Sequence, residues 1–331
     1  MIKPLVKAVV TGGAGFIGSH IVDSLIREGC NVVVIDNLSS GQKDFLREAM
    51  RSGRVKLVLD DLKDPNGGWV QEFKGADIVY HFAANPEVRV SMTNPRIHFN
   101  ENVLVTFNVL EACRVNDVKE LVFASSSTVY GDAKKFPTPE DYEPKEPISV
   151  YGAAKLASEN LIVTYSIAYG VRSLILRFAN IVGPRQSHGV IIDFIRKLRL
   201  NPTVLEILGD GTQRKSYLHV RDLISGINVA LKALRNSGKP YEVFNLGNED
   251  WVTVRRIAEL VVEEMGLKDV EFRYKLATPD GRGWKGDVKF MLLDISKIKA
   301  YGWRPSMNSE EALRDAISAA LTSQSLGVAG C

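Results

Sequence analysis

A tyrosine and a lysine four residues apart, Tyr151 and Lys155, are of the types and spacing that suit proton transfer. They lie in a stretch with helical character, residues 151–169, so one helical turn places the phenol and the ammonium on the same face. A free tyrosine loses its proton near pH ~10, and a nearby positive charge lowers that pKa. We therefore predict that Lys155 lowers the pKa of Tyr151, which then acts as a general acid/base near neutral pH. Because such pairs are common on helices, the prediction depends on the preceding motifs.

A glycine-rich loop is the first of those motifs. A β-branched run at residues 5–10 is followed by Gly12, Gly13, Gly15 and Gly18, and residues 19–28 then have helical spacing. Strand, glycine loop and helix form the context that a dinucleotide-binding fingerprint requires. The glycines allow the backbone to approach a pyrophosphate, and the helix N-terminus offers N–H groups and its dipole to the negative charge.

An acidic residue follows the glycines at the expected distance. The apolar strand at residues 31–35 ends in Asp36, and a carboxylate there hydrogen-bonds the adenosine ribose and repels a 2′-phosphate. Residues 37–42 contain no Arg or Lys that would attract that phosphate. The sequence therefore predicts NAD, not NADP, as the cofactor. The competing interpretation is an Asp that caps a helix in an ordinary α/β turn.

Strands and helices alternate through the first half of the chain. Further strands are predicted at residues 55–59, 77–80, 121–124 and 172–177, and helices at residues 95–115 and 151–169. This alternation predicts an α/β fold with a doubly wound parallel (Rossmann) sheet, in which ligands bind at the carboxyl ends of the strands. The proline-rich loop at residues 130–150 is expected to lie over that site, because long loops in compact domains are often functional.

The pattern becomes less regular after Asn180. Helices are predicted at residues 220–234, 254–265 and 309–321, with short strands at residues 272–274 and 291–293. We predict an NAD-binding domain at residues 1–179 that includes the catalytic Ser, Tyr and Lys. Residues 180–331 then form a smaller mixed α/β lobe that mainly binds substrate, with the chain crossing back to the sheet.

Composition excludes several other classes of protein. The 331 residues include 42 basic and 39 acidic side chains, a net charge of +3, without a basic block, so nucleic acid is not expected as a partner. Three cysteines (Cys30, Cys113 and Cys331) and five histidines are dispersed, which predicts neither a disulfide framework nor a metal site. No apolar run approaches the ~18 residues of a membrane span, and no signal-peptide pattern opens the chain, so we expect a cytoplasmic protein.

Taken together, these motifs resemble the extended short-chain dehydrogenase/reductase family, and within it the UDP-glucose (UDP-galactose) 4-epimerases of archaeal or bacterial type. The matching segments span residues 9–305. They are residues 11–18, Asp36-Asn37, Asp61-Leu62, Phe82-Ala83-Ala84, Asn102, residues 125–131, Tyr151 with Lys155, residues 177–180 and, in the second half, residues 211–219, 286–288 and 302–305.

The resemblance implies a role for each matching position. Tyr151 would remove the proton of the sugar 4-hydroxyl, Lys155 would hold the nicotinamide ribose, and Ser126 would share the hydroxyl proton. The implied cofactor contacts are Gly12, Gly15, Phe16, Ile17, Gly18, Asp36, Asn37, Asp61, Leu62, Phe82, Ala83, Ala84, Asn102, Tyr151 and Lys155. The implied UDP-sugar contacts are Ser126, Thr128, Tyr151, Asn180, Val190, Arg214, Lys215, Arg282 and Asp287. The resemblance also implies a homodimer that pairs through the helices at residues 95–115 and 151–169.

Several alternatives stay open. Dehydratases of this family carry an Asp-Glu pair where this chain has Ser127-Thr128, which argues against a dehydratase. Epimerases of UDP-N-acetylglucosamine or UDP-glucuronate, a nucleotide-sugar decarboxylase or reductase, and a non-catalytic NAD-binding protein are the other candidates. The family's diphosphate-binding Arg has Lys215 at the aligned place and Arg214 one residue before it, so either could bind the diphosphate. Arg282 is offset from the family's late Arg.

Overall fold

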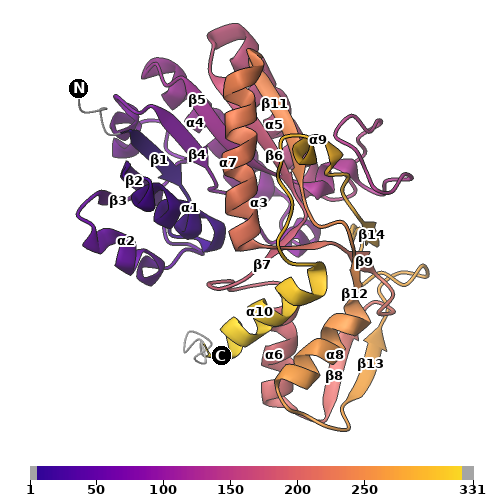
Figure 1. Ribbon diagram of the computed structural model, residues 1–331. Coiled ribbons are helices and arrows are strands. Elements are labelled where there is room, and N and C mark those ends of the chain that lie inside the picture. Colours follow the sequence, from indigo (N-terminus) through magenta and orange to yellow (C-terminus); the bar gives the residue numbers. More distant parts are fainter. Residues whose placement is uncertain (1–5, 323–331) are drawn as a thin grey trace. The chain divides into compact units, whose positions relative to one another are not determined.

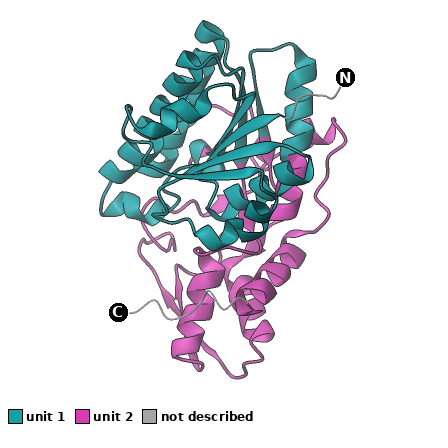
Figure 2. Ribbon diagram, turned by 90° about the vertical axis from the view of Figure 1, so that its left-hand side faces the viewer, with its two compact units in different colours: residues 1–129, 145–177, 227–244 teal, residues 130–144, 178–226, 245–331 magenta. Residues whose placement is uncertain are grey.

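A computed structural model of the chain describes residues 6–322. Two compact units make up the chain, and each combines three segments (Figure 2). Unit 1 contains residues 1–129, 145–177 and 227–244, and unit 2 contains residues 130–144, 178–226 and 245–331. Leu5, at the start of the first predicted strand, and Cys331 lie outside the described residues.

A seven-stranded parallel sheet forms the centre of unit 1. Its strands are β1 (Lys7–Thr11), β2 (Asn31–Asp36), β3 (Val55–Leu59), β4 (Ile78–His81), β5 (Glu120–Ser126), β6 (Arg172–Phe178) and β11 (Tyr241–Leu246). They are ordered β11-β6-β5-β4-β1-β2-β3, which confirms the predicted doubly wound fold. The strands β2 and β3 lie on one side of β1, and β4, which follows them in the chain, lies on its other side. The carboxyl ends of β1 and β4 therefore flank the switch point at which such sheets bind ligands.

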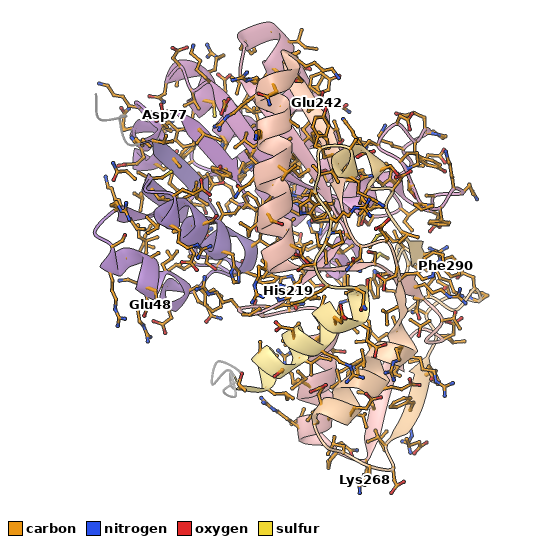
Figure 3. All side chains as sticks on the ribbon, in the orientation of Figure 1. Glu48, Asp77, His219, Glu242, Lys268 and Phe290 are labelled. Atoms are coloured by element: carbon orange, nitrogen blue, oxygen red, sulfur yellow. The ribbon has the colours of Figure 1, made fainter. Side chains whose placement is uncertain are left out.

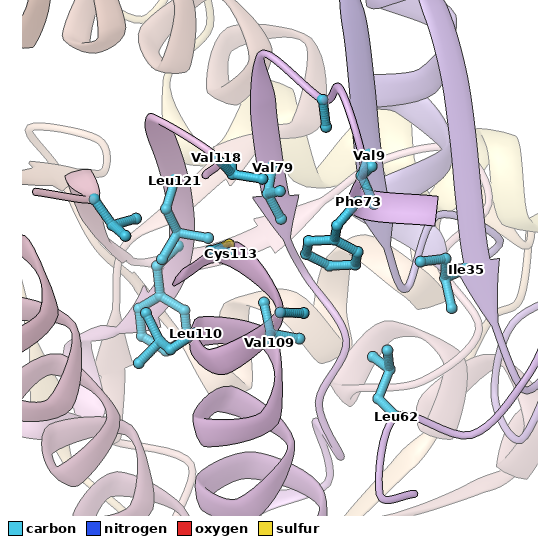
Figure 4. Close-up of a cluster of buried hydrophobic side chains, with 14 of the residues drawn as sticks. Val9, Ile35, Leu62, Phe73, Val79, Val109, Leu110, Cys113, Val118 and Leu121 are labelled. Carbon is cyan, nitrogen blue, oxygen red and sulfur yellow. The ribbon is translucent and has the colours of Figure 1, made fainter. Parts of the chain in front are cut away.

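Apolar side chains that alternate along the strands form the core of unit 1. On one face, Val9 is opposite Val33 in β2 and Val79 in β4. This face packs against Val109 and Leu110, as Figure 4 shows, in a cluster that also contains buried aromatic side chains. Burying each such side chain contributes roughly 1.5–3 kcal/mol, so this layer holds the strand ends in fixed register.

The helices of unit 1 lie on both faces of the sheet, with α1 and α7 in front of it and α4 and α5 behind it in Figure 1. They are α1 (Phe16–Arg27), α2 (Arg47–Arg51), α3 (Arg96–His98), α4 (Val105–Val115), α5 (Val150–Tyr169) and the greater part of α7 (Val220–Ser237). At the start of α5, the Ser149 side chain accepts a hydrogen bond from the Gly152 N–H at 3.1 Å. The helix ends at Gly170 with φ 71°, a left-handed conformation that glycine favours. Tyr151 thus lies in the first turn of a helix that is capped at both ends.

The helical stretch predicted at residues 95–115 is interrupted. Between α3 and α4 the chain forms a π-helical turn, Phe99–Leu104, which contains Asn102. The Asn102 carbonyl accepts hydrogen bonds from the hydroxyls of Thr106 (2.6 Å) and Ser158 (3.3 Å). Turns of this kind are common at functional sites and were not visible in the apolar periodicity. The first helix also begins earlier than predicted, at Phe16, so Gly18 lies in its first turn.

Unit 2 has three small sheets and a separate apolar core. Its strands are β7 (Asn180–Val182), β8 (Val204–Leu208), β9 (Arg214–Lys215), β10 (Tyr217–His219), β12 (Val252–Thr253), β13 (Glu271–Lys275) and β14 (Phe290–Met291). Its helices are α6 (Val190–Leu200), α8 (Val254–Glu264), α9 (Ser296–Lys299), α10 (Ser309–Thr322) and the first residues of α7. The sheets are β10-β7, β12-β9-β14 and β13-β8. Across residues 6–322, none of the helices is long and apolar enough to span a membrane.

Candidate active site

Tyr151 and Ser126 form the centre of the site in unit 1. Tyr151 lies in the first turn of α5, Ser126 ends β5, and their hydroxyls are hydrogen-bonded. The Ser126 oxygen accepts hydrogen bonds from the Thr128 N–H at 3.2 Å and from the Thr128 hydroxyl at 3.0 Å. Because these two bonds occupy both lone pairs of the Ser126 oxygen, its own proton is left for the phenol or for a bound hydroxyl.

Lys155 lies one helical turn after Tyr151 and is buried, with 4% of its surface exposed. Its Nζ donates a hydrogen bond to the backbone carbonyl oxygen of Ala124 at 2.8 Å and lies 5.9 Å from the centroid of the Tyr151 ring. Burial lowers the pKa of Lys155 to about 7, and the nearby Glu159 carboxylate opposes this shift.

The predicted lowering of the Tyr151 pKa by Lys155 does not occur in this structure. Burial raises the pKa of Tyr151 to about 12, because a phenolate loses its hydration, and the hydrogen bond from Ser126 opposes the shift. The sequence showed that the two side chains share a helix face, but it did not show the depth of burial. A phenolate at neutral pH therefore requires additional positive charge, which a bound ligand can supply.

The glycine loop has the close packing that a pyrophosphate site needs. A Cβ added at Gly18 would lie 2.2 Å from the Gly12 carbonyl oxygen, and a Cβ at Gly12 (φ +68°) would lie 2.6 Å from the Ala83 nitrogen. Helix α1 begins after Gly15 with no side-chain cap and no acidic residue in its first turn. The first N–H groups of a helix have no intrahelical partner, so those of Phe16 and Ile17 are suited to an anion.

Asp36 is held at the end of β2 in the orientation that a ribose needs. Its Oδ2 accepts a hydrogen bond from the Ala14 N–H at 2.9 Å, and its Oδ1 accepts one from the Leu38 N–H at 2.8 Å. Burial raises the pKa of Asp36, and these two hydrogen bonds oppose the shift. Each oxygen keeps a lone pair for a ribose hydroxyl, so the residues present fit NAD. The neighbouring Asn37 is exposed, and its Oδ1 accepts a hydrogen bond from the Ser39 N–H.

The other predicted cofactor residues follow two further strands of the same sheet. Asp61 and Leu62 come after β3, and Phe82, Ala83 and Ala84 come after β4. The Leu62 side chain is buried in the apolar core of unit 1. The Asn102 side chain is buried, and its Oδ1 accepts a hydrogen bond from the Asn85 N–H at 2.8 Å. In this structure Asn102 therefore supports the loop after β4.

A buried histidine that the sequence analysis did not select connects the glycine loop to α4. His81 Nδ1 lies 2.7 Å from the Thr11 hydroxyl, and His81 Nε2 lies 3.0 Å from the Thr106 hydroxyl. Burial, aided by the Lys155 charge, lowers the pKa of His81 to about 3, so the ring is neutral. Its position at the end of a predicted strand, directly before Phe82, was the signal that could have identified it.

A second histidine, His98, contacts Tyr151. The rings of His98 and Tyr151 are 5.5 Å apart in an edge-to-face arrangement, and burial lowers the pKa of His98. Glu159, one turn after Lys155, was also missed, although its i+4 spacing was visible in the sequence. The residues around Tyr151 thus include several polar groups that come from other elements of unit 1.

In unit 2, Lys215 is the more buried of the two candidate diphosphate ligands. Its Nζ lies 2.7 Å from Oδ1 of Asp287, which is 2% exposed. The guanidinium of Arg214 instead lies 5.8 Å from the ring centroid of Trp251, and the Arg214 side chain is exposed. Neighbouring residues in a strand point to opposite sides, which is why only one of them turns inward.

The remaining candidates in unit 2 differ in their partners. Both Nη atoms of Arg282 donate hydrogen bonds to the Asp132 carboxylate, at 2.9 and 2.8 Å, so this cation already has an anionic partner. The buried Nδ2 atom of Asn180 has no hydrogen-bond partner among the described residues. Val190 is the first residue of α6, a helix without a side-chain cap. His219, labelled in Figure 3 and placed just before α7, is paired with Asp315 at 2.9 Å.

Comparison with known proteins agrees with this geometry. Residues 8–247 match the NAD dependent epimerase/dehydratase family. A putative UDP-glucose 4-epimerase of Methanocaldococcus jannaschii is 35% identical over an alignment of 311 residues, and the match covers 92% of this chain and 95% of the relative. The crystal structure of a UDP-galactose 4-epimerase is 50% identical with a TM-score of 0.86, and the match covers 96% of this chain and 99% of that one.

Two further structures bear on the ligands. The UDP-glucose 4-epimerase of Thermus thermophilus, solved as a complex with NAD, is 32% identical with a TM-score of 0.82, and the match covers 96% of this chain and all of that one. The UDP-N-acetylglucosamine 4-epimerase of Methanobrevibacter ruminantium is 31% identical with the same TM-score, and the match covers 96% of this chain and 99% of that one. These two relatives, which are named for different sugars, are thus similar to this chain to nearly the same degree.

Proposed function

Because the chain belongs to the NAD-dependent epimerase/dehydratase family, we propose that it interconverts UDP-glucose and UDP-galactose by inverting C4 through a 4-keto sugar. The observation that carries the proposal is the hydrogen bond between Tyr151 and Ser126, with Lys155 one turn behind them. The similarity to a UDP-galactose 4-epimerase at 50% identity supports the choice of sugar.

Proton transfer is the part of the reaction that this chain's own side chains perform. Tyr151 takes the proton of the sugar 4-hydroxyl and returns it after the keto sugar has turned over, while Ser126 hydrogen-bonds the same hydroxyl. When bound, NAD would supply a positively charged nicotinamide as the hydride acceptor and donor for C4. The Gly12–Gly18 turn and Asp36 hold the dinucleotide, and Lys155 holds its nicotinamide ribose and adds positive charge.

Unit 2 supplies the groups for the UDP-sugar diphosphate. Lys215 is a cation oriented by Asp287. The Nδ2 of Asn180, which has no hydrogen-bond partner among the described residues, can donate a hydrogen bond to a phosphate oxygen. Val190 offers the N–H of an uncapped helix start. Arg282 would contribute only after exchanging its Asp132 partner for the substrate, so we assign the main contact to Lys215.

Oligomerisation through α4 and α5 is the second part of the proposal, and its partner is a second copy of this chain. The exposed apolar side chains of these helices include Phe107 (41% exposed), Ile167 (67%) and Tyr169 (56%). Two long helices from each subunit can bury these side chains in a four-helix interface. Light scattering at micromolar concentration should give twice the mass of the chain, and a monomer mass would refute this arrangement.

We also propose that the protein acts in the cytoplasm. Cys30 and Cys113 are free, buried thiols, and unpaired cysteines are typical of a reducing compartment. Cell fractionation should recover the protein with cytoplasmic markers, and recovery with secreted proteins would contradict this.

An assay of three substrates side by side tests the function. UDP-galactose, UDP-N-acetylgalactosamine and UDP-glucuronate are incubated with the NAD-loaded protein, and each product is separated from its C4 epimer. We expect the highest kcat/KM for UDP-galactose, with no net consumption of NAD. A higher kcat/KM for either of the other two substrates would assign that substrate in place of UDP-galactose. Stoichiometric accumulation of NADH would indicate an oxidoreductase instead.

A further inference from the structure

Three consecutive residues at the end of β5 are each held by a different polar side chain of α5. Lys155 donates its hydrogen bond to the Ala124 carbonyl, the Ser125 hydroxyl donates one to Glu159, and Ser126 is bonded to Tyr151. The three helix residues are spaced by four, so they form one stripe along α5. Three hydrogen bonds, one for each of these strand residues, therefore connect the strand end that carries Ser126 to the helix face that carries Tyr151.

Glu159, the last of these three helix residues, forms an ion pair with Arg177 that is buried in unit 1. Glu159 is 4% exposed and Arg177, in β6, is also 4% exposed. Arg177 donates two hydrogen bonds to the Glu159 carboxylate, from Nε at 3.0 Å and from Nη2 at 2.7 Å. With Ser125 as a third donor, the carboxylate is held in one position. Burying this ion pair costs free energy on folding, because both charges lose their hydration.

The buried charges around Glu159 would be unbalanced if its carboxylate were removed. Lys155 and Arg177 are two buried cations, and Glu159 is the anion that interacts with both. Burial lowers the pKa of Lys155, and the Glu159 carboxylate opposes that shift. Replacement of the carboxylate by a neutral group would leave the two cations to repel each other.

We propose that Glu159 is a positioning residue of this site, whose carboxylate, fixed by Arg177 one helical turn after Lys155, provides the negative charge for that lysine and aligns the Ser125–Ser126 strand end with α5. The inference rests on the proposed proton-transfer role of Tyr151 and Lys155. The role that it assigns to Glu159 requires no contact between Glu159 and the substrate. The ionisable groups that face Lys155 are Tyr151 and Glu159 on its own helix, His81 on β4 and His98 on α3, with Arg177 on β6 beyond Glu159.

Glu159→Gln is the test, because the amide keeps the size of the side chain and removes its charge. Lysine side chains of the full chain are labelled with 15N, and the Nζ signal of Lys155 is assigned by its loss in Lys155→Met. We expect the Lys155 titration midpoint to fall by about one pH unit or more in Glu159→Gln. Glu159→Asp, which keeps the charge, should restore a midpoint near the wild-type value. The pH at which epimerisation is lost on raising the pH should move down with the midpoint.

Glu120→Gln is the matched control. Glu120, at the opposite end of β5, is 7% exposed and is paired with Arg172 at 2.6 Å and with Arg235 at 2.7 Å. This variant also removes a buried carboxylate from arginine partners, so it should lose stability without moving the Lys155 midpoint. An equal midpoint in wild type and Glu159→Gln, or an equal shift in both Gln variants, would overturn the proposal.

A double variant covers the case in which Glu159→Gln does not fold. Glu159→Gln with Arg177→Met removes both partners, which avoids an unpaired buried cation. Compared with Arg177→Met alone, the double variant should have a lower Lys155 midpoint, and equal midpoints in these two variants would overturn the proposal. Because the titration needs no substrate, it decides the role of Glu159 even if none of the UDP-sugars is epimerised.

Discussion

Lys155 donates a hydrogen bond of 2.8 Å from Nζ to the backbone carbonyl oxygen of Ala124. This bond directs the ammonium to the end of β5, while its Nζ is 5.9 Å from the ring centroid of Tyr151. The lysine is therefore anchored by a strand that lies beside the catalytic helix. The resulting state of the tyrosine, a protonated phenol with a raised pKa, leads to the first prediction.

Without NAD, Tyr151 should stay protonated across the neutral range. Its pKa is raised to about 12, so the phenolate should be absent until the pH approaches that value. The measurement is the phenolate absorbance of wild type minus that of Tyr151→Phe, titrated with and without bound NAD. We expect NAD to lower the midpoint, since its nicotinamide is cationic. A midpoint near neutrality in the NAD-free protein would show that Lys155 alone activates the tyrosine.

Tyr151→Phe should abolish epimerisation and leave NAD bound. Loss of positioned proton transfer typically costs ~10²–10⁴-fold in rate, and the phenyl ring keeps the packing against His98. Turnover of UDP-galactose and the NAD content after gel filtration are measured together. Tyr165→Phe is the control, because Tyr165 lies on the same helix and its hydroxyl is hydrogen-bonded to Glu111. Near-normal turnover in Tyr151→Phe would refute its role as the base.

Asp36→Ala should weaken NAD far more than NADP. Hydrogen bonds to a charged group contribute roughly 1.5–3 kcal/mol, so NAD affinity should fall by at least about tenfold. NADP loses less, because its 2′-phosphate is repelled by the carboxylate in the wild type. Calorimetric titration with each cofactor measures the ratio, and Asp44→Ala, whose side chain is 76% exposed, is the control. Equal losses for both cofactors would mean that Asp36 does not contact the ribose.

Gly18→Ala should disrupt the dinucleotide loop. The added Cβ would lie 2.2 Å from the Gly12 carbonyl oxygen, a backbone atom that cannot move without opening the turn. We expect NAD affinity to fall by more than about tenfold, with a lower melting temperature. Gly68→Ala is the matched control, because the nearest atom to its Cβ, Asp60 Oδ2, is 3.7 Å away. Equal NAD affinity in the two variants would contradict the proposed pyrophosphate site.

Lys215→Gln should raise the KM for the UDP-sugar more than Arg214→Gln does. The glutamine can still donate a hydrogen bond to Asp287, so the fold is retained while the cation is lost. A charge-assisted phosphate contact is worth roughly 1.5–3 kcal/mol, which corresponds to about tenfold or more in KM. Arg214 is exposed and lies over Trp251, so its loss should have the smaller effect. The opposite order would show that Arg214 binds the diphosphate.

Much of the nucleotide-binding half could be predicted, because its signals are local in the chain. Alternation of β-branched runs with helical spacing, the glycines before α1 and the acidic end of β2 each depend on residues close in sequence. The sheet's edge strand β11 could not be placed in this way, since it joins β6 only after the chain has passed through residues 178–226 of unit 2. The orientation of Lys215 was also undetermined, because it depends on the pairing of β9 with β12 and β14.

That Tyr151 and Lys155 share a helix face follows from the order of residues in the chain, because a spacing of four matches the helical repeat. Their ionisation could not be derived in the same way. It depends on how completely water is excluded and on which charges other elements bring near, and both are set by the packing of α5 against β5 and β6. The Tyr151 pKa is raised because burial outweighs a single hydrogen bond, and the lowering of the Lys155 pKa by burial is opposed by Glu159, which a strand arginine holds in place.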